Sequence, residues 1–140
     1  MHSEQENIAR TLILHKVDWL GYRGGRLPKG SFTRYFFISI EGKDPSPSFL
    51  KQLGEHFVGD SLSMEDKNAR NFKVSNIIHK QTRKPGMQIY VRDIKIITPN
   101  QATATCGWRS GGLSAERSDF QLRKVNSRWV ILRRGNIRKA

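Results

Sequence analysis

The feature that most constrains this chain is the segment Met87–Arg134, which reads as a succession of β-strands separated by short turns. Apolar and polar residues alternate there with a period of two, the pattern of strands with one buried face. The predicted strands are Met87–Ile97, Ala102–Ser110, Ser118–Val125 and Arg128–Arg134. Short connections join sequential antiparallel neighbours, so the segment predicts an antiparallel meander.

The same alternation predicts which side chains of the meander face the interior. The residues expected on the inner face are Ala102, Ala104, Cys106, Trp108, Phe120, Leu122, Trp129 and Ile131. Ala102, Ala104 and Cys106 have small side chains, whereas the inward-facing residues of the neighbouring strands are large. This difference in size leaves room for a helix to lie across the inner face. Val130 and Leu132 fall on the opposite face, so the last strand carries apolar residues on both sides.

The beginning of the chain supplies that helix, predicted over Ser3–Leu20. Ser3 followed three residues later by Glu6 has the spacing of a capping box, and Gly21 ends the helix. Two adjacent rows form its apolar face. They are Ile8, Leu12, His15 and Trp19 in one row, and Ala9, Ile13, Lys16 and Leu20 in the other.

The middle of the chain predicts a strand over Tyr35–Glu41 and a helix over Ser46–Phe57, which Ser46 and Pro47 begin. A further strand, Val74–His79, is expected to form a hairpin with the first strand of the meander. Residues 135–140 read as a basic tail. The order of elements predicts an α+β fold, with helices on one face of a curved antiparallel sheet, and the 140 residues are expected to form a single domain.

Composition limits the cellular setting. A single cysteine, Cys106, excludes an internal disulfide framework and is typical of a reducing compartment. The first twenty residues carry too many charges for a signal peptide, and no apolar run approaches the length of a membrane span. We therefore expect a cytoplasmic protein without a membrane partner.

The net charge of +13 is unevenly distributed along the chain. Residues 1–66 hold eight Lys or Arg and nine Asp or Glu, whereas residues 67–140 hold seventeen and three. A basic half suggests an anionic partner such as nucleic acid or an acidic protein, and a solvated surface without a partner is the alternative. The candidate residues are Lys80, Arg83 and Lys84 at the predicted hairpin tip, with Arg133, Arg134, Arg138 and Lys139 near the end of the chain.

The closing strands resemble those of nuclear transport factor 2-like domains, also called cystatin-like. The resemblance rests on Ile94–Ala104, Gly112–Leu113, Phe120–Lys124 and Arg128–Ile131, and the segment Ile40–Leu50 is similar to one found in bacterial members of that superfamily. It implies a cone-shaped fold, in which the sheet curls around the first helix and leaves a pocket at the open end. It also implies a homodimer formed through the convex face, where Val130 and Leu132 are expected.

The pocket that this resemblance implies has a predicted lining. It consists of His15, Trp19, Tyr35, Phe37, Asp93, Trp108, Phe120 and Trp129. No catalytic motif of the superfamily matches, so the resemblance implies no catalytic residue. His15 could serve as a pocket base and Asp93 as a pocket carboxylate. We favour a packed or rim histidine that makes one hydrogen bond, and an aspartate that pairs with Arg92 or Lys95 or marks a bulge.

The sequence supports three hypotheses of function. The first is a non-catalytic domain that binds a small molecule or a partner in the pocket. The second is a basic module for nucleic acid or an acidic protein, and the third is an isomerase-like or dehydratase-like enzyme that uses His15 or Asp93. Cys106 reads as a small core residue. The histidines have no metal-ligand spacing, so we expect neither a metal nor a cofactor.

Overall fold

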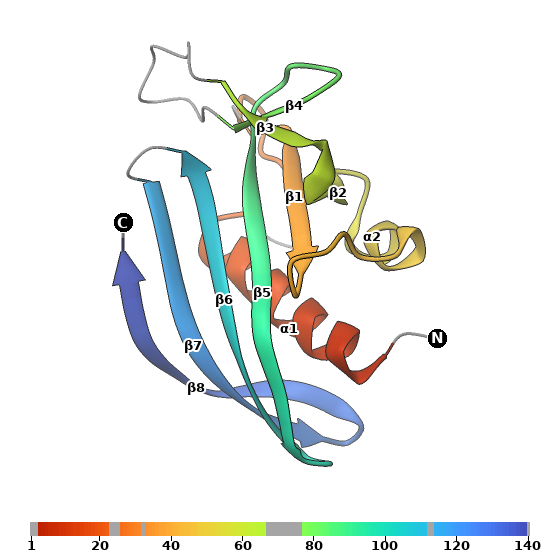
Figure 1. Cartoon of the computed structure of the whole chain (residues 1–140), viewed down its shortest axis with the longest axis vertical. Helices are drawn as coiled ribbons and strands as arrows, with labels where there is room; N and C mark the ends of the chain where they lie inside the picture. Colours follow the sequence, from red (N-terminus) through yellow and green to blue (C-terminus); the bar gives the residue numbers. More distant parts are fainter. Residues whose placement is uncertain (1–2, 23–25, 32, 67–76, 112–113, 140) are drawn as a thin grey trace.

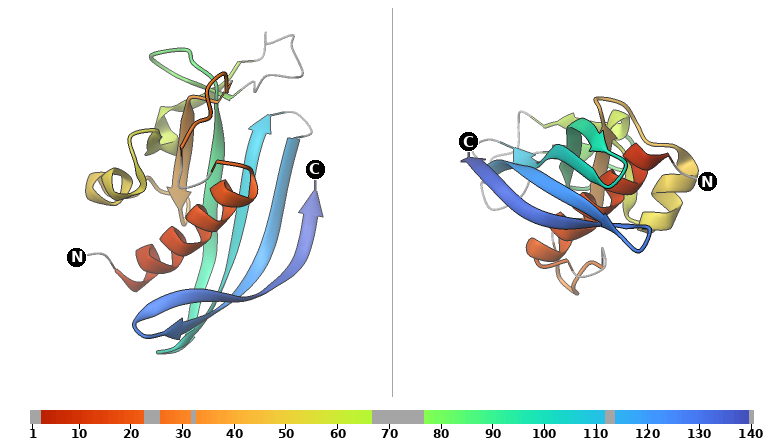
Figure 2. Two further views of the ribbon diagram at one scale, coloured as in Figure 1. Left: turned by 180° about the vertical axis from the view of Figure 1, so that it is seen from behind. Right: turned by 90° about the horizontal axis from the view of Figure 1, so that it is seen from below.

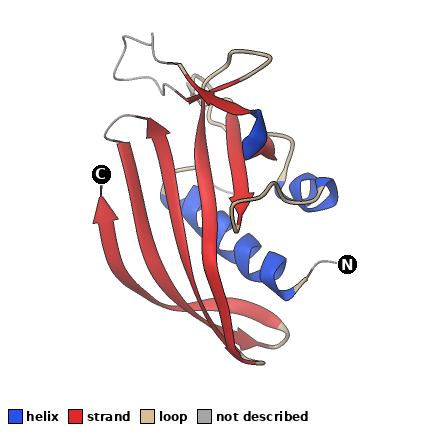
Figure 3. Ribbon diagram, viewed as in Figure 1, coloured by secondary structure: helices blue, strands red, loops and turns tan. Residues whose placement is uncertain are grey.

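The computed structural model describes residues 3–22, 26–31, 33–66, 77–111 and 114–139. Figure 3 shows the helices and strands of this part of the chain. The helices come from its first half and most strands from its second. In chain order the elements are α1 (Glu4–Trp19), β1 (Tyr35–Ile40), α2 (Pro47–Leu53), β2 (Phe57–Gly59), the 3₁₀ helix η2 (Asp60–Leu62), β3 (Ser63–Glu65), β4 (Ile77–His79), β5 (Gly86–Thr98), β6 (Gln101–Gly111), β7 (Ser114–Val125) and β8 (Arg128–Lys139).

One mixed sheet of six strands has the order β2-β1-β5-β6-β7-β8 (Figure 1). Strands β5 to β8 are antiparallel neighbours, so the predicted meander is confirmed. The expectation of an antiparallel sheet throughout is wrong, because β1 runs parallel to both β5 and β2. The long connection from β1 to β5 provides the crossover that a parallel pair needs. Strands β3 and β4 form a separate antiparallel pair.

Helix α1 lies across one face of the sheet (Figure 2). The end of β7 and the beginning of β8 curve around the start of this helix. Its buried face is formed by Ile8, Ala9, Leu12, Ile13, Lys16 and Val17. The predicted capping box is present, since the Ser3 hydroxyl accepts from the Glu6 amide and the Glu6 carboxylate accepts from the Ser3 amide. None of the described helices is long and apolar enough to span a membrane.

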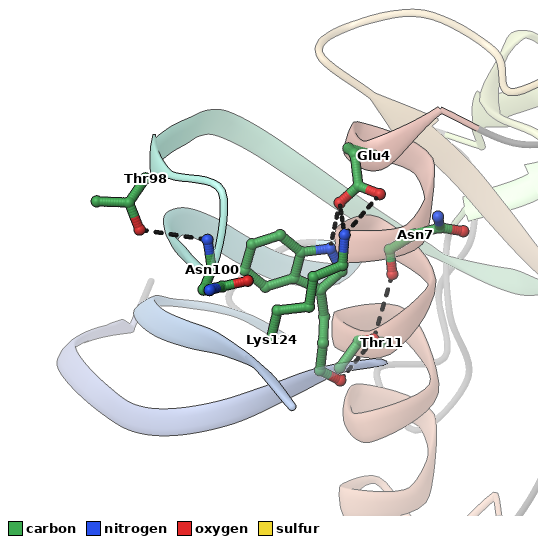
Figure 4. Close-up of polar contacts among 7 residues, drawn as sticks. Glu4, Asn7, Thr11, Thr98, Asn100 and Lys124 are labelled. Atoms are coloured by element: carbon green, nitrogen blue, oxygen red, sulfur yellow. Dashed lines mark hydrogen bonds and ion pairs between the residues drawn. The ribbon is translucent and has the colours of Figure 1, made fainter. Parts of the chain in front are cut away.

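A polar cluster anchors the start of α1 to the β7–β8 hairpin (Figure 4). Lys124 Nζ donates to both Glu4 carboxylate oxygens at 3.0 Å, and the Trp129 indole donates to Glu4 Oε2 at 2.8 Å. Two turns further along the helix, the Thr11 hydroxyl lies within hydrogen-bond distance of two carbonyl oxygens, that of Asn7 at 3.2 Å and that of Trp129 at 3.3 Å. We call Glu4, Lys124 and Trp129 the Glu4 cluster.

The inner face of the meander is the one that the alternation predicts. Ala102, Ala104, Cys106, Phe120, Leu122 and Trp129 are buried, and Trp108 and Ile131 pack against the same core. The opposite face, which we call the outer face, carries the alternate residues of each strand. Val130 and Leu132 are exposed on it, as predicted. Asn126 and Ser127 form the two-residue turn between β7 and β8, with φ of 51° and 65°, values that suit a type I′ hairpin turn.

Three predicted elements differ in the structure. The second helix ends at Leu53, because Gly54 takes up a φ of 143° and the chain then turns into β2. Strand β4 pairs with β3 and not with β5, since both neighbouring positions of β5 are taken by β1 and β6. The predicted start of that strand at residues 74–76 lies outside the described residues. The predicted basic tail is the end of β8, whose backbone pairs with β7 as far as Lys139.

Candidate functional site

The most unusual residue of the inner face is Lys16. At 3.6 residues per turn it falls in the middle of the buried stripe of α1, between Leu12 and Ile13 on one side and Val17 on the other. Only 1% of its surface is exposed. A lysine is almost never this deeply buried without a partner, so its surroundings define the site.

A glutamate and two aromatic rings surround the ammonium group of Lys16. Its Nζ lies 3.9 Å from Glu116 Oε1, and Glu116 is itself buried. The same nitrogen lies 5.1 Å from the centre of the Trp19 ring and 5.7 Å from that of Phe120, within range of cation–π attraction. The ammonium therefore has a counter-charge and two ring faces nearby, all at distances longer than a hydrogen bond.

Strand pairing brings further polar groups to the same place. Glu116 on β7 lies opposite Trp108 on β6, and the next inward pair is Ser118 opposite Cys106. Buried polar atoms of four residues have no hydrogen-bond partner in the part of the chain that the structure describes: Lys16 Nζ, Trp108 Nε1, Glu116 Oε1 and Ser118 Oγ. We call these four residues the inner polar site.

The unsatisfied hydrogen-bonding groups of this site lower the stability of the fold. Each unsatisfied buried polar group costs about 1–3 kcal/mol, and charged groups cost more. Burial lowers the pKa of the Lys16 ammonium, while Cys106 and Glu116 act in the opposite direction. The site offers N–H donors from Lys16 and Trp108, an acceptor from Glu116, and a hydroxyl that can do either. A small molecule with both acceptor and donor atoms would complement these groups.

Four of the predicted pocket residues meet at this site or its margin. Trp108 and Phe120 line it, Trp19 covers the ammonium while 52% of its own surface stays exposed, and His15 meets the Phe120 ring edge-on at 5.9 Å. His15 is largely exposed, because it lies at the margin of the helix stripe and not in its middle. Burial, followed by the charges of Lys16 and Arg134, holds the pKa of His15 below its ordinary value of 6.5.

The other predicted pocket residues lie elsewhere. Phe36 and Ile38 point into the core, so strand alternation sends Tyr35 and Phe37 to the opposite face, where both rings pack against His79. Trp129 lies at the opposite end of α1, in the Glu4 cluster. The structure therefore does not bring these three aromatic residues to the inner polar site.

Asp93 also lies away from the inner polar site. It lies at a bulge in β5 with a φ of 54°, and its carboxylate faces Arg92 Nε at 3.8 Å, which confirms the bulge and the pairing with Arg92. It lines a groove of about 680 Å³ that crosses four strands. The polar side chains of this groove, which we call the outer groove, are Asp93, Lys95, Thr103, Thr105, Asp119, Gln121 and Arg133.

The predicted basic residues do not form one patch. Lys80, Arg83 and Lys84 are exposed on the turn between β4 and β5, at the end of the molecule where β3 and β4 lie (Figure 1). Arg133 and Arg134 lie on β8 and point to opposite faces, because they are consecutive residues of a strand. Arg133 lines the outer groove, whereas the Arg134 guanidinium lies 5.8 Å from the Trp19 ring at the margin of the inner polar site.

Cys106 is completely buried, and burial raises the pKa of its thiol to about 12. A thiol with so high a pKa is a poor nucleophile, so Cys106 acts as a small packing residue. Among the described residues, no three His, Cys, Asp or Glu side chains are grouped closely enough to hold a metal ion.

Sequence reasoning missed Lys16, Glu116 and Ser118 as site residues. Lys16 was visible as the single charge on an otherwise apolar helix row, and this was the one available signal. Glu116 falls in a polar segment without apolar alternation, which reads as a connector, although β7 begins at Ser114. No protein-family model matches the chain, and neither the comparison with curated proteins nor that with solved structures gives a match.

Proposed function

We propose that this chain is a nuclear transport factor 2-like domain that binds a small polar molecule at the inner polar site. The observation that supports the proposal is a group of four buried polar atoms under the C-terminal part of α1, none of which has a hydrogen-bond partner among the described residues. The α+β architecture, with a curved sheet against an N-terminal helix, supports the cone-shaped fold that the resemblance implies.

The side chains of the site indicate the chemistry of the ligand. An oxygen such as that of a carboxylate or carbonyl would accept hydrogen bonds from Lys16 Nζ and Trp108 Nε1. A hydroxyl or amine on the same ligand would donate to Glu116 Oε1. The rings of Trp19 and Phe120 provide an apolar wall. Small hydroxy acids and amino acids carry this combination of groups.

The arrangement favours binding over catalysis. His15 and Asp93, the two side chains that an enzyme was expected to use, have different surroundings. His15 meets the ring of buried Phe120 beneath α1, whereas the Asp93 carboxylate is 71% exposed at the bulge of β5 and faces Arg92. No described residue forms a hydrogen bond with His15, so the histidine has no carboxylate to orient it. General acid–base catalysis requires such groups within reach of the same substrate.

Thermal-shift assays with a panel of small hydroxy acids and amino acids, followed by calorimetric titration, test the proposal. We expect at least one compound to raise the Tm of the wild type and to have no effect on the variant Lys16→Met/Glu116→Leu. Glu4→Gln is the matched control, since it removes a charge from the opposite end of the same helix and should leave binding unchanged. Equal shifts in the wild type and the double variant, or no shift with any compound, would contradict the proposal.

A further inference from the structure

The outer face of the meander gathers positive charge. Strand alternation directs Lys95, Arg117, Arg123 and Arg133 to this face, and none of the four forms an ion pair with a described residue. Two further arginines of the face are paired, Arg92 with Asp93 and Arg109 with Glu65. The unpaired cations are spread over β5, β7 and β8, so they form a broad surface and not a single point of charge.

The outer groove runs through this surface. It crosses β5 to β8, and with adjacent strands about 4.8 Å apart its cationic ends, Lys95 and Arg133, are separated by about 14 Å. Between them lie Thr103 and Gln121, which can donate hydrogen bonds to oxygen atoms. The carboxylate of Asp119, the one acidic group at the centre of the groove, accepts a hydrogen bond from Thr105 at 2.8 Å.

A single aromatic ring, that of the partly buried Tyr90, lies on the outer face near the groove. Tyr90 lies opposite Gly107, and its ring occupies the space that a side chain at residue 107 would fill. The Arg92 guanidinium lies 5.4 Å from the centre of the Tyr90 ring and belongs to the residue paired with Thr105. A tyrosine and an arginine stacked beside a cationic groove are the groups that bind an unpaired base.

We propose that the outer groove binds single-stranded nucleic acid, with the phosphate backbone along the groove and a base against Tyr90. Cations spread across several strands match a partner with regularly repeated negative charge, and the polar side chains between them suit phosphate and sugar oxygens. An acidic protein would share the charge but would make no use of the stacking surface. This activity is independent of the inner polar site, which lies on the other face of the sheet.

Fluorescence anisotropy with a labelled single-stranded oligonucleotide of mixed sequence, at low and at physiological salt, tests the proposal. The variant Lys95→Glu/Arg133→Glu should bind at least about tenfold more weakly, and its salt dependence should be less steep by about 0.7 for each phosphate that is no longer neutralised. Lys80→Glu/Lys84→Glu is the matched control, because it makes the same change of net charge on an exposed turn away from the groove. It should bind within about twofold of the wild type.

Tyr90→Ala should weaken binding about fivefold or more, since stacking on an aromatic ring accounts for such a loss per base. Circular dichroism confirms that each variant is folded, and Lys95→Gln/Arg133→Gln replaces the charge reversal if that variant does not fold. Absence of binding at low salt, or equal losses in the groove and control variants, overturns the proposal. A stronger affinity for duplex DNA or for an acidic peptide also overturns it.

Discussion

Each end of helix α1 contacts a cluster that contains a glutamate, a lysine and a tryptophan, but the hydrogen bonding of the two clusters differs. At the beginning of the helix, Glu4 is bonded by Lys124 and by the Trp129 indole at 2.8–3.0 Å. Near its end, Lys16 faces Glu116 at 3.9 Å, and the Trp108 indole nitrogen opposite has no partner among the described residues. The first cluster is partly exposed and fully bonded, whereas the second is buried and incompletely bonded.

This difference distinguishes an anchor from the site at which we propose that a ligand binds. The Glu4 cluster satisfies its own groups and thereby fixes the β7–β8 hairpin to the helix (Figure 4). The inner polar site carries a desolvation cost that its own interactions do not offset, because a buried ion pair is favourable only when its remaining hydrogen-bonding groups are satisfied. A bound molecule that supplied those bonds would remove the cost.

The largest contrast is expected from removing one carboxylate at each end. Glu116→Ala leaves a buried ammonium without a counter-charge and should lower the free energy of unfolding by about 3–5 kcal/mol. Glu4→Ala removes a partly exposed group and should lower it by about 1 kcal/mol. Denaturant unfolding of both variants at neutral pH measures the two values. Equal losses would mean that the two clusters do not differ in kind.

The alkaline stability of the protein should depend on Lys16. Its pKa in the folded state lies below the ordinary value of 10.5, so between these values the unfolded chain binds one more proton than the folded chain. Unfolding free energy therefore rises with pH in that interval, by at most about 1.4 kcal/mol per pH unit, and the gain is complete above 10.5. Denaturant unfolding of Lys16→Met over the same range should lack this rise. A rise of the same size in the variant would assign it to other groups.

The acid stability should depend on the opposite end of the helix. Hydrogen bonds from Lys124 and then Trp129 hold the pKa of Glu4 below its ordinary value of 4.5. The stabilisation from this group is therefore present above 4.5 and is lost as the pH falls through the folded-state value. Glu4→Gln should be slightly less stable at neutral pH, by about 1 kcal/mol or less, and this difference should shrink in acid. A difference that stays constant with pH would contradict the role given to the carboxylate charge.

Local pattern was sufficient to predict the meander and the capping of the helix, and it failed where the outcome depended on pairing between distant segments. Alternation placed Ala104, Phe120 and Trp129 on the buried face, and the capping spacing placed the start of α1. The parallel pairing of β1 with β5 has no local signature, since it depends on which strand position remains free once the crossover is complete.

The candidate site was predicted in part for the same reason. Trp108 and Phe120 follow from strand parity, which a sequence displays directly. His15 and Lys16 are adjacent on the helix, and only the packing of the whole stripe shows that the lysine lies in its middle. Glu116 could be recognised only from its proximity to Lys16, a residue one hundred positions away. Tyr35 and Phe37 were misplaced because their strand is apolar on both faces, so its parity gives no direction.

We infer that the Glu4 cluster stabilises the fold by itself, and we propose that the inner polar site does so only with a bound molecule. The most direct test is the free energy of unfolding of two matched double variants, Lys16→Met/Glu116→Leu and Lys124→Met/Glu4→Leu, without added ligand. The first should be as stable as the wild type or more stable, by up to about 4 kcal/mol, because apolar residues of similar volume replace an incompletely bonded buried pair. The second should be less stable by about 1 kcal/mol, because the Trp129 indole loses its acceptor. A loss of several kcal/mol in the first variant would contradict the account, since it would make the Lys16–Glu116 pair a structural anchor like the one at the other end of the helix.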